Sequence, residues 1–490
     1  MSETGRSESR GRCLIGGRWV APASGETLPV ICPSDGKVFA EIASGGAADI
    51  DAAVKAARRA RESGAWGRLP AFERGRLLMR LGEAILDHAE ELAALESRDT
   101  GKPLRQGRAD IRACARYFEY YGGAADKLHG DTIPFLEGYT AATFWEPHGV
   151  TAHIIPWNYP AQIFGRSVGA ALAAGNACVL KPAEDACLSL LRIGELALEI
   201  GLPEGALNIV PGLGEEAGAA LAAHPGIDFI SFTGSPETGT AVQAAAARNH
   251  VGCTLELGGK SPQILFADAD LEAALPVVVA AIVQNAGQTC SAGSRVLIER
   301  GIYEEVTERL AARFRELVAG PHDRDLDLGA LINRTQMERV RGYLEEARAR
   351  GIPVLAEGRI VEDAPTGGYY VAPVLLGPVP PEERLACEEV FGPVLACLPF
   401  AGEAEALAIA NATPYGLVAG VWTRDGGRQL RMAHGIRAGQ VFLNGYGAGG
   451  GIELPFGGVG RSGHGREKGF AGLYEFVRLK TVVWNHGRAP

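Results

Sequence analysis

The feature that most constrains the fold is a regular alternation of short β-branched runs with helical segments between residues 148 and 257. The expected strands span residues 149–155, 177–181, 207–210, 228–232 and 253–257. The expected helices between them span residues 167–174, 188–200, 215–223 and 237–247. Strands that alternate with helices in this way form a parallel sheet with helices on both faces, so the sequence predicts an α/β fold. Such sheets bind ligands beyond the carboxyl ends of their strands.

A second strand–helix series is expected from about residue 261 to 445, and helical stretches precede the first series near residues 47–66, 71–97 and 104–127. The chain has 490 residues, which is more than one domain of ~100–200 residues accommodates. We therefore expect two α/β domains that meet near residues 257–259. Two β-prone stretches, around residues 135–145 and 479–484, belong to neither series and are expected to pair outside both cores.

Composition argues against several classes of partner. The formal net charge is −10, which disfavours nucleic acid because that partner needs a clustered basic surface. The nine cysteines are scattered without a C-x-x-C pair, so we expect no metal site, and reduced thiols in a cytoplasm. The longest uncharged apolar run, residues 275–283, is far shorter than the ~20 residues that a membrane helix requires. The sequence thus predicts a cytoplasmic protein without a nucleic-acid or membrane partner.

Three motifs together offer the groups for covalent chemistry at a carbonyl carbon. Cys290 lies in Gln-Asn-Ala-Gly-Gln-Thr-Cys-Ser (284–291), after an apolar segment that would hold the thiol at the edge of a cleft. Glu256 lies in Leu-Glu-Leu-Gly-Gly-Lys-Ser-Pro (255–262), and Asn158 in Pro-Trp-Asn-Tyr-Pro (156–160). These supply a thiol nucleophile, a carboxylate base and an amide donor for an oxyanion. Taken alone, each has a structural alternative, since an isolated cysteine is more often a buried inert thiol.

Two further motifs suit a dinucleotide. Phe-Thr-Gly-Ser-Pro-Glu-Thr-Gly (232–239) follows an expected strand and opens a helix, where backbone N–H groups and the Ser235 hydroxyl suit a pyrophosphate. A simple capped helix start explains this motif equally well. Lys181 and Glu184 follow another strand and could bind a ribose; the carboxylate would repel a 2′-phosphate, which favours NAD and leaves NADP as the weaker possibility. The alternative for this pair is a solvated surface contact.

These motifs, and their order along the chain, resemble those of the NAD(P)-dependent aldehyde dehydrogenase family. The resemblance covers nearly the whole sequence. Further matching stretches are Ala-Leu-Ala-Ala-Gly-Asn (171–176), Gly-Gln-Thr-Cys (287–290), Glu-Glu-Val-Phe-Gly-Pro-Val (388–394), Asn444, Pro-Phe-Gly-Gly (455–458) and Ser-Gly-His-Gly-Arg-Glu (462–467). The resemblance implies a non-acylating enzyme that oxidises an aldehyde to the carboxylic acid with NAD.

The resemblance also implies a role for each motif residue. Cys290 would attack the aldehyde carbon to give a thiohemiacetal and then a thioester, while Asn158 and the Cys290 N–H hold the oxyanion. Glu256 would activate the hydrolytic water, and Glu467 would join in proton release. Implied cofactor contacts are Ile155, Trp157, Lys181, Glu184, Gly214, Ser235, Leu257, Glu389 and Phe391. Implied substrate contacts are Tyr159, Gln162, Arg166, Thr289 and Ser291, with Phe164 and a glycine-rich loop at 447–451 completing the pocket.

The implied aldehyde dehydrogenase fold has a Rossmann-like cofactor domain, a second α/β catalytic domain and a small β arm for oligomerisation. The expected bounds are 1–127 and 147–257 for the NAD-binding domain, 258–446 for the catalytic domain with Cys290, 447–475 for a return segment, and 128–146 with 476–490 for the arm. We expect a homodimer or homotetramer, because the arm exposes β-prone sequence without a core of its own.

Two adjacent residues depart from the family pattern. Ser167 stands where most relatives carry a lysine thought to join Glu256 and Glu467 in proton release, and serine cannot supply a cation. Arg166 stands where many relatives have an aromatic residue but succinate-semialdehyde dehydrogenases have an arginine, so it could bind a substrate carboxylate. Two other anion-binding features of those enzymes are missing, since their positions are Gln284 and the glycines 449–451. Alternatively, Arg166 pairs with a neighbouring acid such as Glu119.

Three other functions stay open from the sequence. A semialdehyde specialist would use Arg166 for its substrate. A coenzyme A-acylating enzyme is a second possibility, although Glu256 argues against it because such relatives commonly lack this carboxylate. A catalytically silent binding protein is a third, and the intact set of Cys290, Asn158 and Glu256 argues against it.

Overall fold

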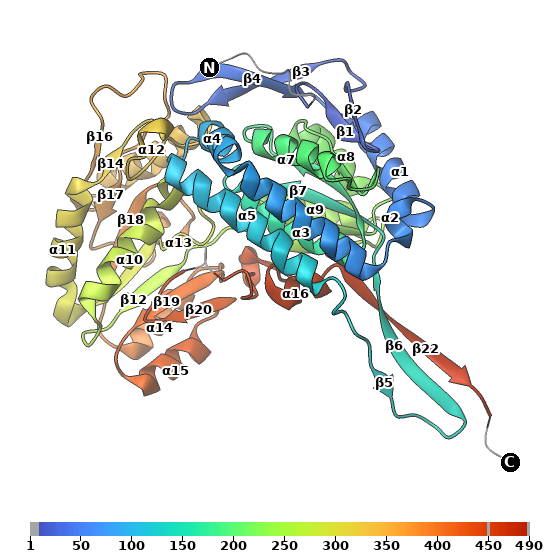
Figure 1. Cartoon of the computed structure of the whole chain (residues 1–490). Coiled ribbons are helices and arrows are strands. Elements are labelled where there is room, and N and C mark those ends of the chain that lie inside the picture. The colour runs from blue at the N-terminus through green and yellow to red at the C-terminus, as the bar shows by residue number, and fades with distance from the viewer. Residues whose placement is uncertain (1–8, 448–450, 488–490) are drawn as a thin grey trace.

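Two sheets, of eight and seven strands, form the centres of the two halves of the chain in the computed structural model, which describes residues 9–447 and 451–487 (Figure 1). The predicted α/β fold is confirmed. The strand order of the first sheet is β2-β1-β9-β8-β7-β10-β11-β21, with a parallel centre and antiparallel strands at both edges. Its strands are β1 (Cys13–Ile15), β2 (Arg18–Val20), β7 (Val150–Ile155), β8 (Ala177–Pro182), β9 (Leu207–Ile209), β10 (Phe229–Thr233), β11 (Gly252–Glu256) and β21 (Gly463–His464).

The central strands of this sheet are buried along almost their whole length because helices cover both of their faces. Its helices are α1 (Ala47–Glu62), α2 (Ala65–Arg68), α3 (Ala71–Asp87), α4 (Ala89–Thr100), α5 (Leu104–Ala124), α6 (Pro160–Ala174), α7 (Leu188–Glu199), α8 (Ala219–Ala223) and α9 (Pro236–Ala247), with a π-helical turn, η1 (Gly214–Gly218), before α8. The long helices α3 and α5 lie side by side (Figure 1).

Several helix boundaries differ from the sequence prediction, and two of the differences are large. The expected stretch 71–97 is two helices, because the backbone leaves helical geometry at His88 (φ −106°, ψ 18°). Helix α6 begins at Pro160, seven residues before the expected start at 167, because a proline in the first turn has no N–H to leave unpaired and already has a helical φ. The earlier start places Gln162 and Arg166 on one helix.

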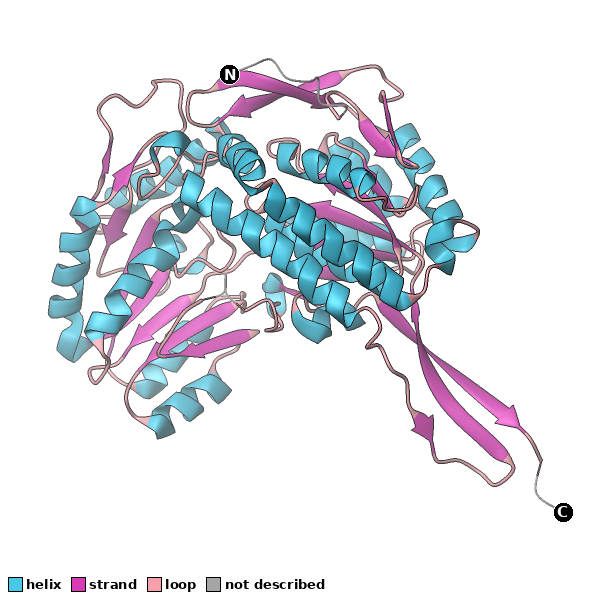
Figure 2. Cartoon of the chain, in the orientation of Figure 1, coloured by secondary structure: helices cyan, strands magenta, loops and turns pink. Residues whose placement is uncertain are grey.

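The second sheet has the order β15-β17-β18-β13-β12-β19-β20 and is parallel except for β15. Its strands are β12 (Pro262–Leu265), β13 (Arg295–Glu299), β15 (Val354–Glu357), β17 (Val374–Leu376), β18 (Val394–Phe400), β19 (Val418–Trp422) and β20 (Gln440–Leu443). Its helices are α10 (Leu271–Val283), α11 (Tyr303–Glu316), α12 (Arg334–Ala349), α13 (Arg384–Cys387), α14 (Glu403–Asn411) and α15 (Gly426–Gly435). Figure 2 shows the same layering of helix on strand in both halves.

A three-stranded sheet projects from the body of the molecule (Figure 1). Strand β22 (Val477–Asn485) pairs antiparallel with β6 (Tyr139–Pro147), and β5 (Thr132–Ile133) joins the other edge of β6. The expected pairing of the two β-prone stretches is therefore observed, although the strand starts at Tyr139 rather than near residue 135. The remaining elements are the hairpin β3 (Thr27–Cys32) with β4 (Lys37–Ala43), the pair β14 (Val318–Ala319) with β16 (Arg359–Ile360), and α16 (Gly469–Tyr474).

Buried apolar side chains gather in one large cluster around each sheet. A third, small cluster contains Leu417, Val418 and Phe456, with the partly buried Cys290 packed against it. No helix in the described part of the chain is long and apolar enough to cross a membrane.

Candidate active site

A cavity of about 720 Å³ lies where the first sheet faces the second half of the chain. From the first half, residues that follow β7 and β10, together with Glu256 at the end of β11, line its wall. From the second half come the segment around Cys290 and the segment around Glu389. The site therefore lies beyond the carboxyl ends of parallel strands, as expected for such a sheet.

Cys290 follows a turn that few residues can adopt. After α10 ends, Asn285 and Ala286 have positive φ angles of 48° and 52°, a conformation that costs roughly 1–3 kcal/mol for each non-glycine residue. The Asn285 side chain holds this turn, because its Nδ2 donates to the carbonyls of Asn158 (3.0 Å) and Gln288 (3.2 Å). Burial raises the pKa of the Cys290 thiol to about 11, while the nearby Arg166 lowers it. At neutral pH the thiol is thus protonated and needs a base to react.

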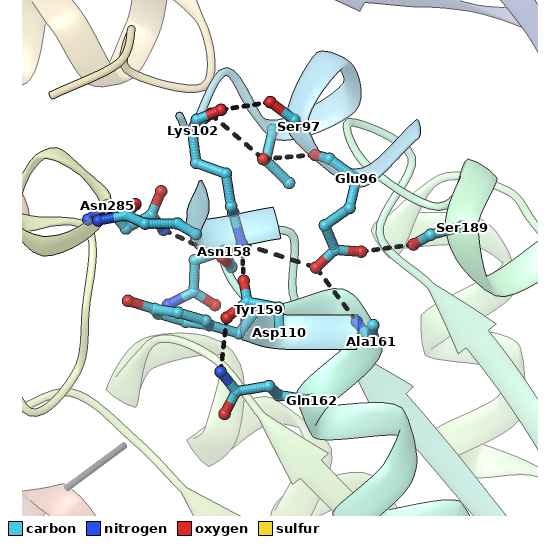
Figure 3. Close-up of polar contacts among 12 residues, drawn as sticks. Glu96, Ser97, Lys102, Asp110, Asn158, Tyr159, Ala161, Gln162, Ser189 and Asn285 are labelled. Atoms are coloured by element: carbon cyan, nitrogen blue, oxygen red, sulfur yellow. Dashed lines mark hydrogen bonds and ion pairs between the residues drawn. The ribbon is translucent and has the colours of Figure 1, made fainter. Parts of the chain in front are cut away.

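Asn158 is fixed through both its amide and its backbone. Its Nδ2 donates to the carbonyl of Gln288 at 3.0 Å, which places the amide beside the segment that carries Cys290. Its own carbonyl accepts from Lys102 Nζ at 2.9 Å and from Asn285 Nδ2 at 3.0 Å (Figure 3). An amide donor held this firmly next to a thiol suits a developing oxyanion.

A buried ion network lies behind Asn158 (Figure 3). Lys102 Nζ lies 2.6 Å from Asp110 Oδ2 and 3.6 Å from Glu96 Oε1, and all three side chains are almost wholly buried. The other oxygen of Asp110 accepts from Gln162 Nε2 at 2.6 Å. The network therefore joins α4, α5 and α6 and fixes both Asn158 and Gln162 on the cavity wall.

We expect Lys102→Met to destabilise the protein by about 3–5 kcal/mol, because it leaves two buried carboxylates without their cation. The measurement is the free energy of unfolding in urea. Lys55→Met is the matched control: Lys55 pairs with Asp51 at 2.6 Å, but on the surface, where such a pair contributes only ~0–1 kcal/mol. A loss of less than 1 kcal/mol for Lys102→Met would contradict the structural role of the network.

Glu256 is a buried carboxyl that the protein leaves unsatisfied. It is 2% exposed, and neither carboxylate oxygen has a hydrogen-bond partner among the described residues. Burial, and then the charge of Glu467, raise its pKa well above the usual value, while Arg166, Arg466 and Lys468 lower it. A carboxyl tuned in this way can accept and return protons near neutral pH.

Arg166 forms a buried ion pair with Glu467. It therefore pairs with an acid, as the alternative expectation held, but Glu119 is the wrong partner. Glu119 instead lies 3.8 Å from Arg116 at the surface. The adjacent Ser167 points away into a chain of hydroxyls: its Oγ lies 2.6 Å from His153 Nδ1 and donates to Ser231 Oγ at 2.8 Å. Ser231 Oγ in turn donates to Glu467 at 3.4 Å.

All five residues expected to contact substrate line the cavity, namely Tyr159, Gln162, Arg166, Thr289 and Ser291. Gln284 Nε2 donates to the Tyr159 hydroxyl at 2.7 Å, and that hydroxyl lies 2.8 Å from Thr289 Oγ1. Phe164 is instead fully buried in the core and does not line the cavity. Residues 448–450 of the expected glycine-rich loop lie outside the described residues.

The residues expected to contact the cofactor fall into two groups. Four of them line the same cavity: Trp157, Ser235, Glu389 and Phe391. Ser235 also caps α9, as its Oγ accepts from the Thr238 N–H at 3.2 Å. Glu389 accepts from the Gly259 N–H at 2.9 Å, and burial raises its pKa to about 7.

The second group does not line the cavity, and three of its residues lie at or beyond the end of β8. Lys181 Nζ lies 2.6 Å from Glu184, whose other oxygen accepts from the Gly214 N–H at 3.4 Å. The Lys181 side chain is only 4% exposed, so this pair is not a solvated surface contact. Ile155 ends β7 and Leu257 follows β11; both are buried, and neither lines the cavity.

Similarity to known proteins identifies the family of this chain. The model of the aldehyde dehydrogenase family matches residues 19–482. The chain belongs to the aldehyde dehydrogenase family. It is 42% identical to aldehyde dehydrogenase family 2 member B4, mitochondrial, of Arabidopsis thaliana, over 97% of this chain and 88% of that protein.

Solved aldehyde dehydrogenase structures share the whole fold. A Burkholderia cenocepacia chain assigned to the aldehyde dehydrogenases has a TM-score of 0.96 and 67% identity, over 97% of this chain and all of that one (100%). The NAD⁺ complex of the Bacillus cereus aldehyde dehydrogenase has a TM-score of 0.94 and 41% identity, over 97% and 96% of the two chains. The fold expected from the resemblance is thus confirmed.

Among the residues of the cavity wall that sequence reasoning missed are Phe456, Lys468 and Tyr415. Phe456 lies within the motif Pro-Phe-Gly-Gly, but the motif does not indicate that its ring lines the cavity. Lys468 directly follows the last residue of the motif Ser-Gly-His-Gly-Arg-Glu, and no local signal shows that its side chain turns inward.

Proposed function

We propose that this chain oxidises an aldehyde to its carboxylic acid with NAD as hydride acceptor. The observation that carries the proposal is the meeting of Cys290, Asn158 and an unsatisfied Glu256 in one cavity. Membership of the aldehyde dehydrogenase family supports the reaction class, and this membership makes the chain an oxidoreductase.

Each of the three groups has a defined step. Glu256 takes the Cys290 proton, and the thiolate forms a bond to the aldehyde carbon while the carbonyl electrons move to the oxygen. The Asn158 amide and the Cys290 backbone N–H stabilise this oxyanion. NAD bound in the cavity would supply the hydride acceptor for oxidation of the Cys290 thiohemiacetal to a thioester. Glu256 passes this first proton to Glu467. It then takes a proton from water, the water oxygen bonds to the thioester carbon, and the carbon–sulfur bond breaks to release the acid and the Cys290 thiolate. Glu467 receives protons from this position.

The cofactor is NAD, which is present in complexes of similar aldehyde dehydrogenases. The cavity residues fit its nicotinamide end, with Glu389 for the ribose and Phe391 beside Trp157, whose ring centroid lies 5.5 Å from that of Phe391. Ser235 and the N-terminus of α9 suit the pyrophosphate. Lys181 and Glu184 suit the adenosine ribose, and nothing lies within 4 Å of a Cβ added at the neighbouring Gly214, so the backbone there is open to a ligand. Because Glu184 is a carboxylate, we propose that NADP is used only weakly.

The test of this function is NADH formation at ~340 nm, the absorption band of the reduced nicotinamide, with aliphatic, aromatic, amino and carboxylate-bearing aldehydes. We expect turnover of neutral aldehydes without a marked preference for carboxylate-bearing ones, because Glu467 already neutralises Arg166. Arg166→Ala should then change kcat/KM for both classes alike. A strong preference for semialdehyde acids that Arg166→Ala removes would instead favour the semialdehyde specialist.

The alternative reactions receive less support. A buried, unsatisfied Glu256 is suited to activate water, which disfavours transfer of the acyl group to coenzyme A. The intact set of Cys290, Asn158 and Glu256 disfavours a silent binding protein. Formation of acyl-coenzyme A, or thiol labelling of Cys290 that NAD alters without any turnover, would reverse these assignments.

We further infer the organisation around this reaction. The half around the first sheet binds the cofactor, the half around the second sheet carries Cys290, and the arm joins subunits of a homodimer or homotetramer. The exposed apolar residues of the arm support the last point, among them Ile133, Phe144, Leu479, Val483 and Trp484. All nine cysteines, which lie in the described part of the chain, are free, which supports a reducing compartment such as the cytoplasm.

A further inference from the structure

Lys468 is a charged residue held in a conformation that ordinarily requires glycine. Its φ of 62° and ψ of 162° lie in a region that costs roughly 1–3 kcal/mol for other residues and is found mainly at functional sites. The residue is nevertheless only 3% exposed, and its side chain lines the cavity that contains Cys290.

The surrounding backbone fixes Lys468 in this position. Glu467 and Phe456 exchange two backbone hydrogen bonds, of 2.7 and 2.8 Å. The Gly472 N–H donates to the Lys468 carbonyl at 2.9 Å. Lys468 Nζ lies 5.0 Å from the centroid of the Phe456 ring, a geometry that stabilises a desolvated cation.

Charged groups from several elements surround Glu256 and Lys468. They are Arg166 on α6, Cys290 after α10, and Arg466 and Glu467 in the segment between β21 and α16. Arg166 also lies over the Phe456 ring, 5.2 Å from its centroid, and it forms the ion pair with Glu467. Glu467 offsets part of the charge of Arg166, so a second cation adds to the positive charge beside Glu256 and the thiol. Arg466 and Lys468 both act on Glu256, but of these two only Lys468 lines the cavity.

We propose that Lys468 is this second cation: its charge keeps Glu256 able to act as a base and stabilises the thiolate of Cys290. The inference rests on the proposed function. It also bears on Ser167, which stands where most relatives carry a lysine. The Ser167 hydroxyl contacts His153 and Ser231 and brings no charge to the site. Lys468 therefore supplies, from a different segment, the positive charge that position 167 lacks.

The direction of the effect follows from the charges. Lys468 lowers the pKa of Glu256. Burial, and then Arg166, lower the pKa of Lys468 to about 8, while Cys290, Glu467 and Glu256 raise it. Removing the cation raises the pKa of Glu256, so the base stays protonated up to a higher pH. Each unit of that rise lowers the activity on the acidic side of the pH profile about tenfold.

The test compares Lys468→Met, Lys468→Gln and Lys468→Arg. The first readout is the pH profile of the steady-state rate after the first turnover. We expect Lys468→Met and Lys468→Gln to move its acidic limb at least one pH unit upward, and Lys468→Arg to restore it. The second readout needs no turnover: the rate at which iodoacetamide alkylates Cys290, followed by peptide mass spectrometry, should rise at a higher pH in the neutral variants.

Arg461→Met is the matched control, because Arg461 lines the same cavity but is half-exposed and pairs with Glu237 at 3.0 Å. It should leave the position of the acidic limb unchanged. An unshifted limb and unshifted alkylation profile in Lys468→Met would overturn the inference. So would a shift that Lys468→Arg fails to reverse, because that result indicates packing rather than charge. If the wild type oxidises no aldehyde, the proposed function fails, and the alkylation profile alone decides the role of Lys468.

Discussion

Cys290→Ala is expected to lower NADH formation from any aldehyde at least ~10⁴-fold, because Cys290 is the nucleophile that forms the proposed covalent intermediate. Binding of NAD should persist, since the residues proposed to hold the cofactor are untouched. The measurements are the rate of NADH formation and the quenching of tryptophan fluorescence by NAD. The loss should be the same for every aldehyde tested.

Cys387→Ala provides the matched control for this experiment. Cys387 also lines the cavity, but its Sγ donates to the Pro381 carbonyl at 3.1 Å and lies outside the proposed machinery. This variant should retain aldehyde oxidation. Residual activity above about one hundredth of the wild type in Cys290→Ala would show that another nucleophile carries the reaction.

Glu256→Gln is expected to separate the two halves of the reaction. Loss of a general base typically costs about 10²–10⁴-fold, and Glu256 has its largest part in the hydrolysis of the thioester. We therefore expect a slow single formation of at most one NADH per active site, followed by a steady-state rate close to zero. Intact-protein mass spectrometry should detect the acyl group on Cys290.

Glu237→Gln is the control for this second variant, because Glu237 lines the cavity but is exposed and pairs with Arg461. Continued steady turnover in Glu256→Gln would mean that another group activates the water. Glu467 is then the first candidate, since it is buried and its charge raises the pKa of Glu256.

Local sequence patterns predicted the elements that carry the site, because the residues of a strand, the turn after it and the next helix are consecutive in the sequence. Asn158, Ser235 and Glu256 were placed correctly at strand ends for this reason. The start of α6 was missed, since the expected helix began only at residue 167 although Pro160 is a favourable residue for a first helical turn. As a result, the sequence analysis did not predict that Gln162 and Arg166 lie on the helix that begins two residues after Asn158.

Contacts between distant segments could not be predicted in the same way. The partner of Arg166 is Glu467 rather than the sequence neighbour Glu119, because the return of the chain after β20 brings Glu467 under α6. Lys102 was not singled out at all, since nothing near it in sequence indicates that its ammonium group reaches the Asn158 carbonyl. Tertiary packing, and not local preference, determines both pairs.

The hydrogen bonds from Asn285 to Asn158 have a consequence for how the protein loses activity. The thiol belongs to the segment built on the second sheet, whereas the oxyanion donor belongs to the first, so the reacting geometry exists only at the seam between them. Heat or denaturant that loosens this seam abolishes turnover while both sheets are still folded. We therefore expect activity to be lost before the secondary structure melts.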